Sequence, residues 1–227
     1  MRAKLWLTCA VTAAALGSTA AVASVVVVRS LGPSAKSFPV GKTLPESAKV
    51  SLQGGDVVTV LGPNSAQTWR GPGNFAAGQV ALASAAGQRG RFGALRSGDV
   101  AHSPSIWDID VSQSGRVCVV NPAKLELWRP EADSAVKVTI RSADGKSQGL
   151  SWAAGKASTI WPSALPITTG AEYRIEWPDS GDTSSLSFVT VGSAPADLVG
   201  AAQLLIENGC QNQLDLLVDG ASKAGAH

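Results

Sequence analysis

The sequence has few of the side chains on which most enzymes rely. It contains two histidines and three cysteines, and it has no Walker loop, dinucleotide fingerprint or G-x-S-x-G nucleophile elbow. His227 is the last residue, so His102 is isolated beside Ser103-Pro104, without a serine nucleophile to activate. Histidine and cysteine also lack the paired spacing of a zinc site. The sequence therefore predicts a protein that is not an enzyme and holds no cofactor.

Two pairs of carboxylates are the remaining metal candidates. Asp108 and Asp110 fall on one face of an expected strand, and Asp179 and Asp182 lie in a loop. Calcium takes about six to eight oxygen ligands, which two carboxylates do not supply. Solvated side chains are the simpler interpretation, and no metal is expected.

The first residues have the features of a secretory signal peptide. A positive N-terminal region precedes the apolar residues 5–16, and an A-x-A cleavage site ends at Ala23. We expect residues 1–23 to be removed and the mature protein to be periplasmic or secreted. An uncleaved membrane anchor is the alternative, because the apolar character continues through residues 25–28 toward the roughly 20 residues of a membrane helix.

The charge balance changes when this signal is removed. The full chain has 19 lysines and arginines against 17 aspartates and glutamates, and Arg2 and Lys4 leave with the signal. The mature chain is then neutral overall, without the basic excess that attracts phosphate backbones or anionic lipids. We expect no nucleic-acid partner and no peripheral membrane binding.

Residues 24–75 predict a small β-domain. Short apolar runs are separated by turns that contain Gly and Pro, and nearly every residue of Asp56–Leu61 suits a pleated strand. The expected strands are residues 25–29, 49–52, 56–61 and 66–70.

Three motifs of this region are distinctive. They are Gly41-Lys42-x-Leu44, Val50-x-Leu52-x-x-Gly55-Asp56-x-Val58-Thr59-Val60 and Arg70-Gly71-Pro72-Gly73-x-Phe75. Together they resemble the periplasmic domain of FecR-type regulators over a quarter of the mature chain. The resemblance implies an envelope β-module that relays a signal or holds a partner, and it brings no catalytic residue with it.

A second β-domain is predicted over residues 106–192, after an Ala-, Gly- and Arg-rich stretch at 76–105 that reads as a linker or a short frayed helix. Alternation in Val136–Arg141 and Tyr173–Trp177 places apolar and polar side chains on opposite strand faces. The strand spacing is typical of an immunoglobulin-like or fibronectin-like sandwich. The expected strands are residues 106–111, 117–120, 124–128, 136–142, 149–152, 158–161, 173–177 and 185–191.

The C-terminal residues change to helical spacing. We expect a helical hairpin over residues 193–219, with Ser193 as the cap, Pro195 in the first turn and a stop at Gly209, followed by a disordered tail at 220–227. The predicted fold class is mostly β: a small FecR-like β-domain plus an immunoglobulin-like β-sandwich with a C-terminal helical hairpin.

Removal of the signal leaves two cysteines, Cys118 and Cys210. Cys118 lies in an apolar strand and Cys210 directly follows the helix stop, so each is held on a defined element. In an oxidising compartment a disulfide between them is the economical interpretation. Two buried free thiols are the alternative.

Tryptophan is abundant in the mature chain. Buried rings would form the cores, whereas exposed rings in a row would bind sugars or a protein. Trp128, Arg129 and Trp177 lie at strand ends beside prolines and are the candidates for a partly exposed binding surface. The tryptophans of the mature chain are Trp69, Trp107, Trp128, Trp152, Trp161 and Trp177.

These observations predict a non-catalytic protein of the cell envelope that binds or holds another envelope protein. A carbohydrate-binding or cell-wall-binding module that uses surface tryptophans is the alternative. The sequence leaves the identity of the partner, the binding surface and the oligomeric state open.

Overall fold

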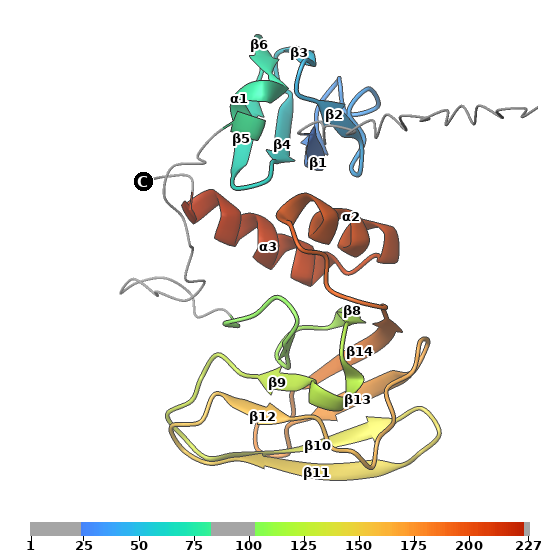
Figure 1. The fold of residues 1–227 in the computed structure, drawn as a ribbon. Coiled ribbons are helices and arrows are strands. Elements are labelled where there is room, and N and C mark those ends of the chain that lie inside the picture. The colour runs from blue at the N-terminus through green and yellow to red at the C-terminus, as the bar shows by residue number, and fades with distance from the viewer. Residues whose placement is uncertain (1–23, 83–102, 225–227) are drawn as a thin grey trace, which may run out of the picture.

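A computed structural model describes residues 24–82 and 103–224, which form two β units with a helical hairpin between them (Figure 1). Residues 24–82 are termed the first β unit, residues 103–192 the second β unit, and residues 193–224 the hairpin. No helix within these ranges is long and apolar enough to cross a membrane.

Several expectations concern residues outside these ranges. They are the signal peptide with its cut after Ala23, the linker residues 83–102 with His102, and the tail residues 225–227.

The first β unit contains a four-stranded antiparallel sheet in the order β2-β1-β4-β5, a two-stranded sheet of β3 and β6, and helix α1. All four expected strands are present, and β2 and β6 are additional to them. The bounds are β1 (Ser24–Leu31), β2 (Thr43–Pro45), β3 (Lys49–Leu52), β4 (Val57–Leu61), β5 (Ala66–Arg70), β6 (Gly73–Ala76) and α1 (Ala77–Leu82).

The valine run at residues 25–28 belongs to β1, a central strand that is buried on both faces. Val25 and Val27 face the core of the first β unit, while Val26 and Val28 face the hairpin. A strand covered on both sides reads as a continuous apolar run instead of an alternating one. The run is therefore part of a sheet and not of a membrane helix.

The first β unit extends beyond Phe75. Strand β6 ends at Ala76, and α1 follows without a break and buries Ala77 and Val80 in the core of the unit. The prediction of a linker was therefore wrong for residues 76–82. Ala76 belongs to β6, and the alternative of a short helix is confirmed for residues 77–82.

The second β unit is a sandwich of a five-stranded sheet, in the order β11-β10-β13-β14-β8, and a three-stranded sheet, in the order β12-β9-β7. Each of the eight expected strands has a counterpart, which confirms the mostly-β fold class. Strand β8 pairs with β14 in parallel, whereas the other pairs of the larger sheet are antiparallel. The bounds are β7 (Ile109–Asp110), β8 (Gly115–Val119), β9 (Glu126–Trp128), β10 (Val136–Ser142), β11 (Ser147–Trp152), β12 (Ser158–Ile160), β13 (Glu172–Glu176) and β14 (Thr183–Thr190), with a 3-10 turn at Pro122–Lys124.

Aromatic rings fill the centre of this sandwich. Trp161 packs edge-on against Tyr173 and Phe188, with ring centroids 5.0 Å and 5.1 Å apart. Its indole N–H donates to the carbonyl of Leu165 at 2.7 Å, so the polar atom of this buried ring is satisfied.

The hairpin consists of α2 (Leu198–Asn208) and α3 (Gln211–Ala224). The cap of α2 is Asp197, whose carboxylate accepts from the Gly200 N–H at 2.8 Å. The prediction of Ser193 as cap and Pro195 in the first turn was therefore wrong, because a better acceptor lies one residue before the first residue of the helix.

The end of α2 follows the prediction. Gly209 has a left-handed φ of +70° and its N–H donates to carbonyls of the last turn, which ends the helix and places Cys210 directly before α3. Helix α3 continues to Ala224 because Val218 and Ala221 extend its buried face. The disordered tail predicted at 220–227 was therefore wrong for residues 220–224.

The hairpin packs against both β units. The sequence predicted its contact with the sandwich, and the structure adds the first β unit, which lies on its other side (Figure 1). The shared apolar cluster contains Val26, Val28, Leu61, Ala66, Cys118, Val199, Ala201, Ala202, Leu205, Cys210, Leu214, Leu217, Val218 and Ala221.

Candidate functional site

Trp128 and Arg129 do not form an exposed surface, because each is only 5 % exposed. The Arg129 guanidinium donates to three backbone carbonyls, those of Lys156 at 3.0 Å, Ala153 at 3.2 Å and Ala132 at 3.3 Å. Its charge also lies 5.8 Å from the centre of the buried Trp152 ring. This arginine fixes the loops around it, so the sequence-based expectation of a binding surface here has to be corrected to a structural role.

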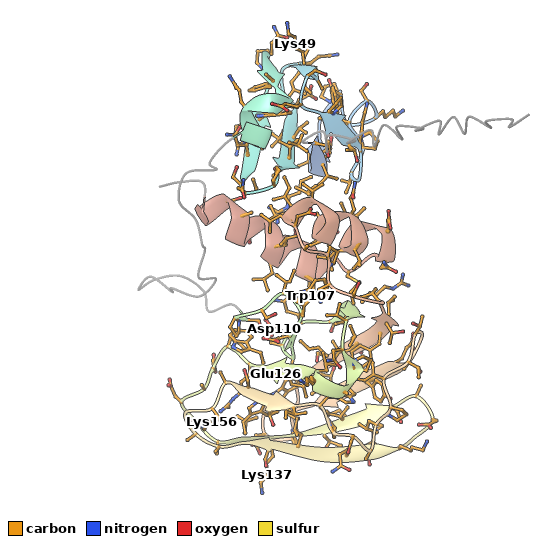
Figure 2. All side chains as sticks on the ribbon, viewed as in Figure 1. Lys49, Trp107, Asp110, Glu126, Lys137 and Lys156 are labelled. Carbon is orange, nitrogen blue, oxygen red and sulfur yellow. A yellow bond between two sulfur atoms is a disulfide. The ribbon has the colours of Figure 1, made fainter. Side chains whose placement is uncertain are left out.

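The remaining tryptophans do not form a row of exposed rings. Trp177 is half-buried and packs on the core of the second β unit. Trp107 is also half-buried, and Figure 2 shows it just below the hairpin, against whose apolar cluster it packs. Trp69 is buried and stacks on Phe75 with ring centroids 5.4 Å apart. A sugar-stacking platform would need adjacent exposed rings, which these positions do not provide.

The disulfide between Cys118 and Cys210 is confirmed. Their Cα atoms lie 5.8 Å apart and the bridge spans 92 positions of sequence. It joins β8, the edge strand of the larger sheet, to the residue that directly precedes α3. The hairpin is thus covalently fixed to the second β unit.

A buried glutamine reinforces this attachment. The side-chain carbonyl of Gln213 accepts from the Cys118 N–H at 2.7 Å, and its amide donates to the carbonyls of Cys118 at 3.0 Å and Ile106 at 2.7 Å. The Gln213 side chain therefore pairs with the free edge of β8 as a neighbouring strand would, which satisfies the N–H and carbonyl of Cys118.

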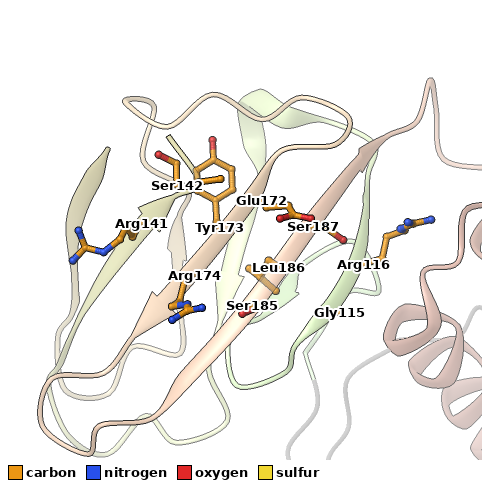
Figure 3. Close-up of a pocket in the computed structure, with 11 residues that line it drawn as sticks. Gly115, Arg116, Arg141, Ser142, Glu172, Tyr173, Arg174, Ser185, Leu186 and Ser187 are labelled. Carbon is orange, nitrogen blue, oxygen red and sulfur yellow. The ribbon is translucent and has the colours of Figure 1, made fainter. Parts of the chain in front are cut away.

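The outer face of the five-stranded sheet is hollowed into an open groove of about 620 Å³ (Figure 3). We term it the arginine groove, because arginines from three different strands line it. The polar side chains that line it include Arg116, Arg141, Glu172, Arg174, Ser185 and Ser187.

Strand register places these side chains on one face. Arg116 on β8 lies opposite Ser187 on β14, and Ser187 in turn lies opposite Glu172 on β13. Two residues away on the same two strands, Ser185 lies opposite Arg174, and Arg174 in turn lies opposite Arg141 on β10. The residues between them in sequence point inward, since successive side chains of a strand alternate between faces.

Three arginines thus lie on one face of the sheet, spread over four adjacent strands. Arg141 makes only a long ion pair with Glu176, at 3.5 Å, and both side chains are substantially exposed. Arg116 donates to the carbonyl of Asn208 at 3.4 Å, at the C-terminal end of α2, where a cation is favoured. Among the residues that the structure describes, Arg174 makes no salt bridge.

One end of the groove is bordered by the turn between β10 and β11. Hydrogen bonds from Ser142 and then Lys146 lower the pKa of Asp144 to about 2, and the Lys146 ammonium lies 2.9 Å from its carboxylate. Because this aspartate is paired with a lysine, it does not cancel the positive charge of the three arginines.

The two carboxylate pairs do not assemble a metal site. Asp110 caps its own turn by accepting from the Ser112 N–H at 3.0 Å, and Asp108 accepts from the Ser103 hydroxyl at 3.0 Å. Burial raises the pKa of Asp108. Residues 24–82 and 103–224 contain no cluster of three or more histidine, cysteine or acidic side chains that could hold a metal ion.

The residues that carry the FecR resemblance have structural roles in this fold. The buried Asp56 carboxylate accepts from the N–H groups of Ser34 at 2.8 Å and Gln53 at 2.6 Å, and hydrogen bonds from Ser34 and Gln53 lower its pKa. The Gly71 N–H donates to the Asp56 carbonyl at 2.9 Å. A Cβ at Gly71 would lie 1.9 Å from the Gln53 carbonyl oxygen, so only glycine fits this contact.

No family model, curated protein or solved structure matches the chain.

Sequence reasoning missed both the arginine groove and Gln213. The alternation in β10 and β13 did place Arg141 and Arg174 on a polar face. It could not show that these strands are neighbours, or that β8 adds Arg116 to the same face.

Proposed function

We propose that this protein is a non-catalytic scaffold of the bacterial cell envelope that binds a protein partner. The observation that carries the proposal is the hairpin, which fixes two β units into one body. On the side of the second β unit it is held by the Cys118–Cys210 disulfide and the buried Gln213. A fixed body with open sheet surfaces is suited to holding a partner, because little ordering is needed on binding.

Contacts on the other side also restrict the first β unit. Val26, Val28 and Leu61 are buried against the hairpin. The Arg29 guanidinium contacts the carboxylates of Asp215 at 2.6 Å and Asp219 at 3.5 Å. Apolar burial and charge pairing together limit the relative motion that is otherwise expected between domains of one chain.

Two further points support an envelope location. A disulfide persists in oxidising compartments such as the periplasm or the cell exterior. The first β unit resembles the FecR-type periplasmic domain, which has a relaying or holding role. The expected signal peptide is tested directly by N-terminal sequencing of the protein recovered from the envelope fraction, which should begin at Ser24.

The test of the function is affinity capture with the folded, oxidised protein on a support, followed by mass spectrometry of the retained envelope proteins. We expect one defined protein to be enriched and to be displaced by excess free scaffold. Enrichment that survives this competition would count as non-specific. Recovery of no specific partner, or turnover of a substrate by the purified protein, would contradict the proposal.

A further inference from the structure

We propose that the arginine groove binds an acidic segment of the protein partner, with Arg116, Arg141 and Arg174 as its carboxylate-binding residues. The inference rests on the proposed function and specifies the chemistry of the partner. Arginine suits this role because its planar guanidinium donates two parallel hydrogen bonds to one carboxylate.

The first argument is the unfavourable arrangement of charge in the free protein. Arg141 and Arg174 are directly opposite each other on neighbouring strands, and both are exposed. Like charges in that position destabilise a sheet. Glu176 contacts the Arg141 guanidinium at 3.5 Å and offsets part of this repulsion, whereas Arg174 makes no salt bridge among the described residues. A carboxylate of the partner would pair with the charge of Arg174.

The second argument is the spacing of the arginines. Figure 3 shows them on three separate strands, with Ser185 and Ser187 on the strand between Arg174 and Arg116. Four adjacent strands at about 4.8 Å spacing span about 14 Å. An extended peptide at about 3.3 Å per residue covers that distance with four or five residues, and its alternate side chains point to one face. A short segment with alternating acidic residues therefore matches the groove.

The third argument separates a peptide from a glycan. Hydroxyl and charged side chains line the groove, and the ring of its only aromatic lining residue, Tyr173, belongs to the core, where its hydroxyl donates to the Pro166 carbonyl at 2.6 Å. Sugar binding relies on exposed aromatic faces. Glu172 lies among the arginines. Its carboxylate can accept hydrogen bonds from the backbone amides of a peptide, and it repels a continuous run of anionic groups.

The experiment is a binding titration of the oxidised protein with a fluorescent Glu-Ser repeat peptide of about eight residues, long enough to cross the groove. A Gln-Ser repeat peptide of the same length is the uncharged control. We expect only the acidic peptide to bind, and its affinity to fall as salt rises, because exposed charges are screened.

Three variants test the site. Arg174→Gln should lower the affinity for the acidic peptide roughly tenfold, as expected for the loss of one charge-assisted contact. The triple change of Arg116, Arg141 and Arg174 to Gln should abolish binding of the peptide. Arg70→Gln, an exposed arginine of the first β unit, is the matched control and should bind normally. The melting temperature of Arg174→Gln should be equal to or above that of the wild type, because the change removes a like-charge pair.

Three results would overturn the inference. They are failure of the wild type to bind the acidic peptide, unchanged binding by the triple variant, and tighter arginine-dependent binding of heparin than of the peptide. Capture of the envelope partner separates the inference from the proposed function. A partner retained equally by wild type and triple variant leaves the scaffold function standing and removes the groove as its site. If the acidic peptide binds but no envelope partner is captured, the groove is supported as a peptide-binding site and the proposed scaffold function is contradicted.

Discussion

The two β units hold the same hairpin in different ways. The second β unit is attached through a disulfide and through Gln213, whose side chain pairs with both backbone groups of Cys118. The first β unit is attached by apolar contact of β1 and β4 and by the exposed Arg29–Asp215 ion pair. One attachment is covalent and directional, and the other depends on the removal of apolar surface from water.

The two attachments should therefore be broken by different conditions. The attachment of the second β unit yields to reductant or to the loss of specific partners, whereas that of the first yields to anything that weakens apolar burial. The hairpin and the second β unit should therefore behave as one cooperative unit, with the first β unit as a separable one.

The largest effect is expected from removal of the disulfide. Cys118→Ser combined with Cys210→Ser opens a loop of 92 positions and should lower the free energy of unfolding by about 4 kcal/mol. Denaturant unfolding under non-reducing conditions measures it. Reductant should destabilise the wild type and leave the variant unchanged, and a variant as stable as the oxidised wild type would contradict the assigned role.

Leu61→Ala should separate the first β unit from the hairpin. The Leu61 side chain is fully buried against the hairpin, so its truncation should cost about 3 kcal/mol. Hydrogen exchange should accelerate in β1 and β4 and remain slow in β8 and β14. The control is Leu31→Ala on β1 of the same sheet, where the leucine is 68 % exposed. This change should alter the free energy of unfolding by less than about 0.5 kcal/mol. Uniform acceleration in both β units would show that they do not separate.

Gln213→Leu tests the directional part of the other attachment. The change leaves the N–H and carbonyl of Cys118 without these partners and should cost about 2 kcal/mol. The same denaturation experiment measures it, with Gln211→Leu as the control at an exposed site two residues away. Equal effects of the two changes would show that the strand-like pairing of Gln213 contributes nothing specific.

The smallest effect belongs to the ion pair of the first β unit. Arg29→Gln removes contacts that are substantially exposed at both partners, so the loss should be below about 1 kcal/mol. It should shrink further in high salt because exposed charges are screened. A loss that persists at high salt would mean that the aliphatic part of Arg29, and not its charge, supports the interface.

Local pattern predicted the elements of this fold better than their contacts. The strands of both β units followed from alternation and turn residues. The disulfide followed because Cys118 and Cys210 are the two cysteines outside the expected signal peptide. The start of α2 was misplaced because Ser193 and Asp197 are both acceptable caps in sequence, and only the path of the chain decides between them.

The position of the hairpin between two β units had a signal that sequence reasoning did not use. Helix α2 carries apolar side chains on more than one side, including Val199, Leu204 and Leu205. A helix that is apolar around most of its circumference is buried on several sides. One sandwich could not cover all of it.

The candidate site was the least predictable part. The arginine groove depends on which strands are neighbours, and Arg116 and Ser187 face each other across 71 positions of sequence. Arg129 next to Pro130 suggested an exposed strand end. Its side chain instead reaches three carbonyls, one in the adjacent loop at Ala132 and two, at Ala153 and Lys156, in a loop more remote in sequence.

The central place of the hairpin has a consequence for how the protein is made. Residues 193–224 are synthesised after both β units, yet they cover Val26, Val28 and Leu61 of the first one. Until the hairpin emerges, this apolar surface of the nascent chain is open to water and to aggregation. A chain that stops before Cys210 can neither close the disulfide nor bury that surface. Burial of this surface therefore waits for synthesis of the hairpin, and products truncated before it should be recognisable to chaperones and proteases by the uncovered face of β1.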